Sequence, residues 1–420
     1  MNPQFDLLAL LAGIAILFGT GFISIRALRQ RSLDRWIASY FRQTITRPRQ
    51  KPGGPLHLIL CIADHYEPGY GKASPAQARE RVRRWVEDYP KLCRRFRDSD
   101  GCPPRHTFFY PIEMYDEEQL EELTTLCRLG LGEVEIHLHH DRDTSEVLRR
   151  TLLRFKELLA ERHGLLARHR ATGELAYGFV HGNWALDNSH PDGRFCGVNN
   201  EIDVLRETGC YADFTLPSAP NPTQTRKINS IYYAVDDPNR PRSHDRGTDV
   251  GSRITTRNAL MIIQGPLVLN WRRRKWGILP RIENGCLQAN QPPTPDRIDA
   301  WLRARVQVRT RPDWFFVKLH THGAPEGNQK ILLGEPMVEF HRELARRAAE
   351  NPNFQFHYVS AREMYNLVRA AEAGWQGTVV DARDFALVLH GPEALSINAA
   401  SDRFIEECAE NECPPADAGK

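Results

Sequence analysis

Strand-like apolar runs alternate with helical segments along most of this chain, and this alternation limits the folds open to it. The strand-like runs cover residues 56–63, 106–111, 134–140, 177–180, 211–216, 314–319 and 354–359. The segments between them carry the hydrophobic period of about 3.6 residues that predicts helices, which begin near Ser74, Asp116, Asp143, Asn200, Thr294, Glu335 and Ser360. Strands alternating with helices favour a parallel sheet or barrel with helices packed on it. We therefore expect one α/β catalytic domain over residues 56–370.

The alternation weakens in two places. Residues 217–295 are rich in Pro, Asn and Arg, with short strands predicted at 231–235 and 260–263. This composition indicates an insertion within the domain. The chain is less regular beyond Gly374, so residues 371–420 are interpreted as a C-terminal tail.

The N-terminal segment predicts a membrane anchor. Residues 7–25 form an uncharged run of 19 residues, long enough at about 1.5 Å per residue to cross a bilayer core of roughly 30 Å. No Lys or Arg precedes the run, which is atypical of a cleaved signal peptide. We expect residues 1–25 to anchor the chain in the inner membrane as a single span. The basic residues follow the run, which places the catalytic domain on the cytoplasmic side.

Residues 26–55 are expected to form a basic juxtamembrane helix followed by a linker. Leu33, Trp36, Ile37, Tyr40 and Phe41 recur at helical spacing, interleaved with arginines. Two interpretations fit this pattern: a helix lying among lipid headgroups, or an amphipathic helix packed on the domain. Lys51-Pro-Gly-Gly-Pro55 then breaks the chain.

Composition excludes few functions but argues against some. The 56 basic residues nearly balance the 53 acidic ones, which does not favour nucleic-acid binding. The nine cysteines include no C-x-x-C pair, which argues against a structural zinc site. They also show no disulfide framework, which favours a reducing compartment.

Polar side chains follow the predicted strands at the point where each one ends. In parallel α/β folds these ends meet on one side of the sheet, where active sites gather. Six strand ends carry such groups, which we take as candidate functional residues: Asp64 and His65; Glu113; His137, His139, His140 and Asp143; His181 and Trp184; Asp213; His320 and His322.

The third of these groups gives the strongest indication of a metal. Side chains alternate along a strand, so His137 and His139 are expected on one face, and Leu138 and His140 on the other. Ions such as Zn²⁺ accept imidazole and carboxylate ligands together. Asp143 is ambiguous, because Asp143-Thr-Ser-Glu146 also fits a helix capping box.

Over residues 56–367 the order of these motifs resembles the NodB-type polysaccharide deacetylase family, in its exopolysaccharide-associated branch. The first family motif, an acidic pair after a strand, matches Asp64 and His65; the second, His-x-x-x-His, matches His139 and Asp143; the late Leu-His motif matches His320. Gly209-Cys-Tyr-Ala-Asp213 resembles a further family segment, and His181-Gly-Asn-Trp184 stands where the family has Arg-Pro. His65 and Asp143 replace the family residues, and the arginine that orients the base is missing.

The resemblance implies a distorted (β/α) barrel that removes N-acetyl groups from a polysaccharide or lipid-linked sugar. It implies a divalent metal ion, zinc by the chemistry of its ligands, held by His65, His139 and Asp143, with Asp64 as base and His320 as acid. Substrate contacts would come from Glu113, His181, Trp184, Asp213 and His322. Expected partners are the carbohydrate, membrane lipids and polysaccharide-assembly proteins.

The residues leave other interpretations open. Asp64 can itself be a metal ligand, with His137 or His140 as its partners. A glycoside hydrolase using Asp64 and Asp213 is an alternative, with the carboxyl groups roughly 5–10 Å apart. A non-catalytic carbohydrate-binding assembly protein is another. The segment Trp271-Arg-Arg-Arg-Lys-Trp276 suits anionic lipid headgroups or a sugar-linked phosphate, or is an ordinary solvated loop.

Overall fold

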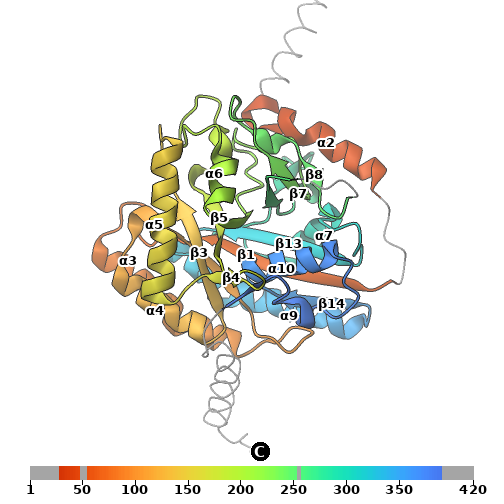
Figure 1. Cartoon of the computed structure of the whole chain (residues 1–420). Helices are drawn as coiled ribbons and strands as arrows, with labels where there is room; N and C mark the ends of the chain where they lie inside the picture. The colour runs from red at the N-terminus through yellow and green to blue at the C-terminus, as the bar shows by residue number, and fades with distance from the viewer. Residues whose placement is uncertain (1–27, 48–53, 253–256, 390–420) are drawn as a thin grey trace, which may run out of the picture.

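The computed structural model describes residues 28–47, 54–252 and 257–389. Its centre is a large, mostly parallel sheet with helices packed on it (Figure 1). Strand β1 (Leu56–His65) lies in the middle, parallel to β13 on one side and to β2 and β14 on the other. The strands follow the order β12-β13-β1-β2-β3-β5-β6-β9-β7-β8. The predicted α/β class is therefore confirmed.

Most predicted strands occur close to their expected positions. The parallel strands are β2 (His106–Pro111), β3 (Gly132–Leu138), β5 (Leu175–His181), β6 (Cys210–Asp213), β9 (Ala259–Ile263), β12 (Cys286–Leu287), β13 (Trp314–Thr321) and β14 (Phe354–Tyr358). Antiparallel pairs add β7 (Ile231–Val235), β8 (Thr248–Asp249), β4 (Ala167–His169) and β15 (Leu387–Val388), and a separate hairpin joins β10 (Val268–Lys275) to β11 (Leu279–Glu283). The order runs from β12 to β8 without joining these two among the described residues, so a closed barrel is not confirmed.

The helices also follow the sequence pattern. They are α2 (Leu33–Thr46), α3 (Pro75–Cys93), α4 (Glu117–Arg128), α5 (Ser145–His163), α6 (Glu201–Glu207), α7 (Pro295–Ala304), α8 (Glu326–Leu332), α9 (Glu335–Glu350) and α10 (Ala361–Glu372). Short 3-10 turns are η1 (Ile112–Met114), η2 (Gly182–Trp184), η3 (Leu186–Asn188), η4 (Ser243–Asp245) and η5 (Val380–Ala382).

Capping side chains explain where several helices begin. Ser74 and Asp116 accept hydrogen bonds from backbone N–H groups in the first turns of α3 and α4. Ser360 and Glu363 form a complete capping box at α10. The capping role considered for Asp143 is wrong, because Thr144 is the N-cap of α5 and accepts from the Val147 N–H.

The two faces of the sheet bury separate apolar clusters. On β1, Leu58, Leu60 and Ile62 pack on the face covered by α3, α4, α5 and α9. The alternate residues, Cys61 and Ala63 among them, pack on the other face with α10. This alternation sends Asp64 and His65 to opposite faces.

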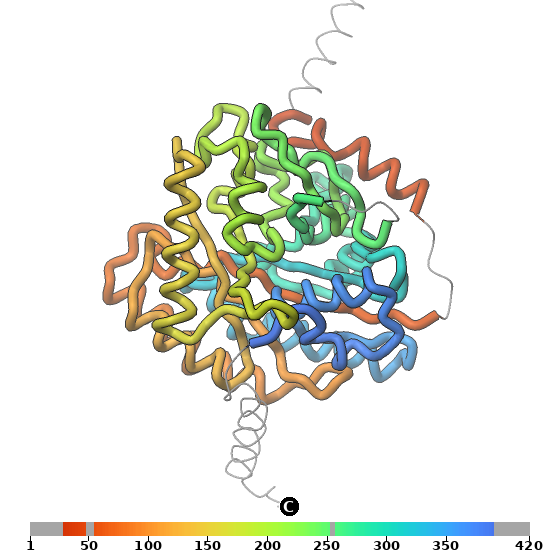
Figure 2. Tube along the Cα trace, viewed as in Figure 1, coloured from red at the N-terminus to blue at the C-terminus, as the bar shows by residue number. Residues whose placement is uncertain are grey.

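Helix α2 packs on the domain, as the second of the two interpretations for this segment expects. Trp36 is fully buried against Ala219, Ile228 and Leu267. Arg35 pairs with Asp245, so α2 lies along the green part of the chain in Figure 2. The predicted anchor at 7–25 falls outside the described residues, and no helix within the described ranges is long and apolar enough to cross a bilayer.

Two segments that the sequence sets apart from the domain, the insertion and the first part of the tail, supply strands that pair with it. Residues 217–295 supply β7, β8, β9 and β12 to the large sheet, and the hairpin β10–β11 stands apart from it. Part of the predicted tail also folds onto the domain, because β15 pairs with β4 and the buried Arg383 binds Asp98.

Candidate metal and active site

Histidines gather around Glu67 where β1, β3 and β13 end. Potential ligand atoms of His65, Glu67 and His137 all lie within 4.8 Å of one another. The Glu67 Oε1 atom lies 3.2 Å from His137 Nε2, 3.5 Å from His139 Nε2 and 3.8 Å from His322 Nε2. One carboxylate oxygen is thus faced by three imidazole nitrogens. We call these five residues the open site.

Hydrogen bonds at the Nδ1 atoms of His137 and His139 fix the orientation of the two rings. The Nδ1 atom of His137 donates to the Val180 carbonyl oxygen at 2.7 Å. The Nδ1 atom of His139 lies 2.5 Å from Glu113 Oε1. Both Nε2 atoms face Glu67. A ring protonated on both nitrogens donates to the carboxylate there, whereas a neutral ring with its proton on Nδ1 presents an Nε2 lone pair that can bind a cation. Histidines held in this way by a carbonyl or carboxylate are typical of metal ligands.

The electrostatics favour the protonation states that a divalent cation requires. Burial holds the pKa of His65 well below its usual value, and neighbouring His322 and His137 lower it further. Burial raises the pKa of Glu67, but the hydrogen bond from His137 and the charges of the nearby histidines outweigh it, so the net pKa is lowered. His65 is therefore neutral and Glu67 ionised, which suits metal binding. The Nε2 atom of His65 is buried without a hydrogen-bond partner among the described residues.

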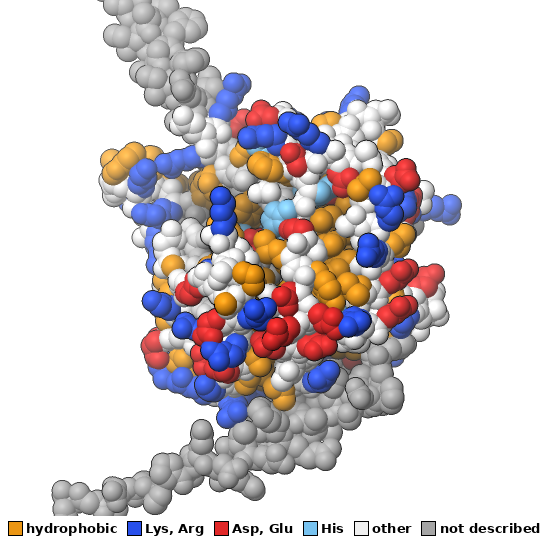
Figure 3. Space-filling view, turned by 90° about the vertical axis from the view of Figure 1, so that its left-hand side faces the viewer, with side chains coloured by type: hydrophobic (Ala, Val, Ile, Leu, Met, Phe, Trp, Pro, Cys, Tyr) orange, Lys and Arg blue, Asp and Glu red, His pale blue; other side chains and the backbone are white. Residues whose placement is uncertain are grey.

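One side of the open site reaches solvent. The side chains of His139 and His322 are 27% and 20% exposed. The Trp184 ring lies 5.7 Å from the rings of both His65 and His322, and Tyr70 lies 5.8 Å from His322. Figure 3 shows histidine side chains reaching the surface between hydrophobic and acidic ones on one face of the molecule. Catalytic zinc sites keep such an accessible position, whereas structural sites are enclosed.

Asp64, the expected base, lies on the opposite face from His65. Its Oδ2 atom is 2.8 Å from His106 Nε2, and its Oδ1 atom accepts the Gly323 N–H at 2.6 Å. Both oxygens are therefore engaged in a fully buried network. Asp64 ties β1 to β2 and to the loop that carries His322, so its placement fits a positioning role rather than that of the base.

The expected ligand set His65, His139 and Asp143 is not brought together. The Oδ2 atom of Asp143 instead lies 3.2 Å from His140 Nδ1. The alternation along β3 explains the split, because His137 and His139 turn toward Glu67 while His140 turns toward His181. The alternative that joined Asp64 to His137 or His140 agrees with the structure only in counting His137, because Asp64 binds His106 and Gly323 on the other face.

Three other predicted residues lie in enclosed surroundings. His181 is fully buried beside His140, and Asp213 binds the backbone and hydroxyl of Thr215. Burial raises the pKa of Asp213 to about 6. His320 is buried next to Lys318, and its Nδ1 atom has no partner among the described residues. Burial, with the charges of Lys318 and His322, holds the pKa of His320 well below its usual value.

Sequence reasoning gave no role to four residues that the structure singles out. Glu67 stands two residues after His65, a spacing that was available as a signal. His106 begins β2, and its partner Asp64 becomes visible only in the folded chain. Cys196 and Glu201 meet His140 and His181 through a loop. No local motif announces these contacts.

No family model matches this sequence, and a search among curated proteins found no significant match.

Proposed function

We propose that the protein is a metal-dependent hydrolase whose ion, zinc, is held by His65, Glu67 and His137. The observation that carries the proposal is the convergence of imidazole Nε2 atoms on the Glu67 carboxylate, on the accessible side of the strand ends. A divalent ion at this position would polarise a substrate carbonyl and lower the pKa of a water ligand.

His139 and Glu113 suit the proton transfers. Glu113 holds Nδ1 of His139, so Nε2 is directed into the site. Burial raises the pKa of Glu113, but the hydrogen bond from His139 and its charge outweigh burial, so the net pKa is lowered. In the proposed reaction His139 takes a proton from the attacking water, and the Glu113 carboxylate stabilises the imidazolium that results. The C–N bond then breaks, and His139 returns the proton to the amine. Amide and water thus give carboxylic acid and amine, and proton exchange between these products leaves carboxylate and ammonium.

The proposed substrate is an N-acetylated sugar in a polymer or on a lipid carrier. Trp184 and Tyr70 border the open side and offer apolar faces to a sugar ring or an acetyl methyl group. The order of motifs shared with NodB-type deacetylases supports this class of substrate. The glycoside hydrolase alternative loses support, because Asp64 and Asp213 are both buried and hydrogen-bonded.

We propose further that the domain works at an anionic membrane surface. The hairpin β10–β11 exposes Trp276 and Ile278, each by 74%, beside Arg274 and Lys275. A cleft of about 680 Å³ next to it is lined by basic side chains that include Arg31. Arg31 lies a few residues after the segment that is predicted to be the membrane anchor. The hairpin would therefore contact the same membrane that the anchor enters.

The test is acetate release from N-acetylated oligosaccharides, measured together with metal content. His137→Ala should lose the open-site ion and at least about 100-fold in activity, because even residues that only hydrogen-bond a metal ligand cost about 10- to 100-fold when they are removed. His163→Ala at the end of α5, where His163 contacts the Tyr115 hydroxyl, is the matched control and should retain both. If the chain binds such sugars but wild type and His137→Ala both release no acetate, it is a binding protein. If reducing ends appear without acetate, it is a glycosidase.

A further inference from the structure

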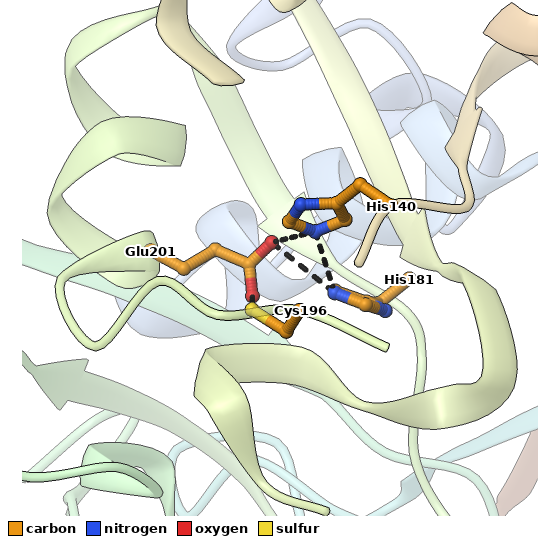
Figure 4. A group of neighbouring side chains, drawn as sticks. All are labelled: His140, His181, Cys196 and Glu201. Carbon is orange, nitrogen blue, oxygen red and sulfur yellow. Dashed lines mark hydrogen bonds and ion pairs between the residues drawn. The ribbon is translucent and has the colours of Figure 1, made fainter. Parts of the chain in front are cut away.

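A second group of potential ligands lies on the other face of the sheet from the open site. His140, His181, Cys196 and Glu201 place one donor atom each within 4.8 Å of one another (Figure 4). They come from the loop after β3, the end of β5, the loop before α6 and the first residue of α6. The two histidine Nε2 atoms are 2.9 Å apart, and Glu201 Oε1 lies 3.1 Å from one and 3.3 Å from the other. Cys196 Sγ is 3.4 Å from Glu201 Oε2.

The hydrogen bonds on the far side of each ring direct lone pairs into this group. Nδ1 of His181 donates to the Gly182 carbonyl oxygen at 2.5 Å, and Nδ1 of His140 faces the Asp143 carboxylate at 3.2 Å. In the neutral rings both Nε2 atoms are then acceptors that face each other and Glu201. Only one proton fits between two nitrogens at this distance. Cys196 Sγ accepts the Val198 N–H at 3.4 Å and lies 3.6 Å from the Val198 carbonyl oxygen, so the backbone holds the sulfur next to Glu201.

We infer that these four side chains form a second, closed metal centre that takes zinc or a similar borderline ion. Ligand bonds of about 2.0–2.3 Å in a tetrahedral zinc site separate the ligand atoms by roughly 3.3–3.7 Å. The two nitrogens and Glu201 Oε1 lie 2.9–3.3 Å apart, slightly closer than that spacing, and all four donor atoms lie within 4.8 Å of one another. Two nitrogens, a sulfur and a carboxylate oxygen also match the donor types that zinc prefers.

Enclosure separates this centre from the open site and indicates a structural role. Side-chain exposure is 7% for His140 and zero for His181 and Glu201, and Cys196 is fully buried. All four positions are supplied by the chain, so no place remains for a substrate. The argument against structural zinc from the missing C-x-x-C motif does not apply to this set, because its ligands come from separate segments.

The ion would hold the loop that carries Trp184. Between His181 and Glu201 five non-glycine residues have left-handed backbones, with φ of 50–69°: Asn183, Trp184, Asp187, Asn188 and Phe195. Such backbones persist where surrounding contacts fix them. Glu201 supplies one such contact, since its Oε2 atom accepts the Asp187 N–H at 2.6 Å. The closed centre would therefore fix the position of Trp184, whose ring borders the open site.

Without an ion, the group would be a buried charge network. Burial lowers the pKa of His140, but Asp143, Cys196 and Glu201 outweigh it and raise the pKa to about 12. A protonated His140 would then bind the Glu201 carboxylate directly, and Cys196 would be a neutral thiol. The two states differ in whether sulfur is bonded to a metal.

Cobalt substitution of the full chain tests this difference. Co²⁺ bonded to a thiolate gives a near-ultraviolet charge-transfer absorption that nitrogen and oxygen ligands do not give. Wild type should show this absorption, and His137→Ala in the open site should keep it while binding about one cobalt fewer per chain. Cys196→Ser should lose it. Cys93→Ser should retain it, because Cys93 is a buried cysteine whose thiol donates to the Pro104 carbonyl oxygen and belongs to neither group of ligands.

The outcomes separate the two centres. Folded, cobalt-loaded wild type without the absorption overturns the closed centre, and so does an unchanged absorption in Cys196→Ser. The wild-type result decides the question even if Cys196→Ser does not fold. If the absorption is present but His137→Ala removes no cobalt, the closed centre stands and the proposed open-site ion fails.

Discussion

Two adjacent histidines, His139 and His140, leave the end of β3 in opposite directions. His139 turns toward Glu67 and the open site, whereas His140 turns toward His181 and Glu201. The strand period predicts this separation from the sequence. It does not reveal that Asp143 accompanies His140, because Asp143 lies in a loop where no period applies. Glu201 follows His140 by 61 residues, so a local sequence pattern cannot predict their contact.

Gly323 allows Asp64 to approach the loop that carries His322. A Cβ atom at position 323 would lie 2.0 Å from Asp64 Oδ2. Gly323→Ala should therefore lower the free energy of unfolding by about 1–3 kcal/mol, the usual cost of overpacking a core. Gly327→Ala is the control, since its Cβ would be 3.8 Å from the nearest atom and it lies in α8. It should leave stability unchanged or raise it by about 0.5–1 kcal/mol. Urea denaturation of both variants checks the prediction, and equal effects would contradict it.

His341 should make the fold sensitive to acid. Burial lowers its pKa from 6.5 to about 3, and its Nδ1 atom hydrogen-bonds the Tyr358 hydroxyl. Below the unfolded pKa the unfolded chain binds the proton and the folded chain does not, so the contribution is present above pH 6.5 and is lost as pH falls toward 3. Between pH 6.5 and 5 the loss is on the order of 1.5 kcal/mol. His341→Leu should flatten the dependence of unfolding free energy on pH by that amount, and parallel curves for variant and wild type would refute it.

The hairpin β10–β11 is not among the strands that the sequence predicts within residues 217–295. For its basic segment the sequence leaves three interpretations: a contact with lipid headgroups, a contact with a sugar-linked phosphate, or an ordinary solvated loop. In the fold, Arg272 and Arg273 pair with Asp299 and Asp296 of α7, which leaves Arg274 and Lys275 beside the exposed tip. The elements of the βα alternation were predicted well because each carries its own hydrophobic period and caps. The hairpin lacks such a period, since only its base is buried.

Neutralising the tip should weaken binding to anionic vesicles. We expect a chain beginning at residue 28 with Arg274→Gln and Lys275→Gln to bind phosphatidylglycerol-containing vesicles about 30-fold more weakly, since each of the two basic residues contributes about 1 kcal/mol near such a surface. Arg342→Gln with Arg346→Gln is the charge-matched control on α9, where both side chains are more than half exposed. Vesicle sedimentation measures the difference. Equal losses in both pairs would indicate a net-charge effect instead.

At the scale of the whole molecule, one sheet separates two groups of ligands with different access to solvent. The sequence could predict the α/β class and the gathering of polar groups at strand ends, because both follow from local patterns and the geometry of parallel strands. It could not predict which polar groups share a face across five strands, since pairing register and loop paths decide this. The loop from His181 to Glu201 links the two groups and carries Trp184 to the open site.

The account depends most on a metal ion at Glu67, and anomalous diffraction at the zinc absorption edge from crystals of the zinc-loaded chain tests it most directly. We predict a peak about 2.0–2.2 Å from Glu67 Oε1, His137 Nε2 and a ring nitrogen of His65. The same peak should be missing from crystals of His137→Ala. Crystals of active, zinc-loaded protein with no anomalous peak beside Glu67 would contradict the account.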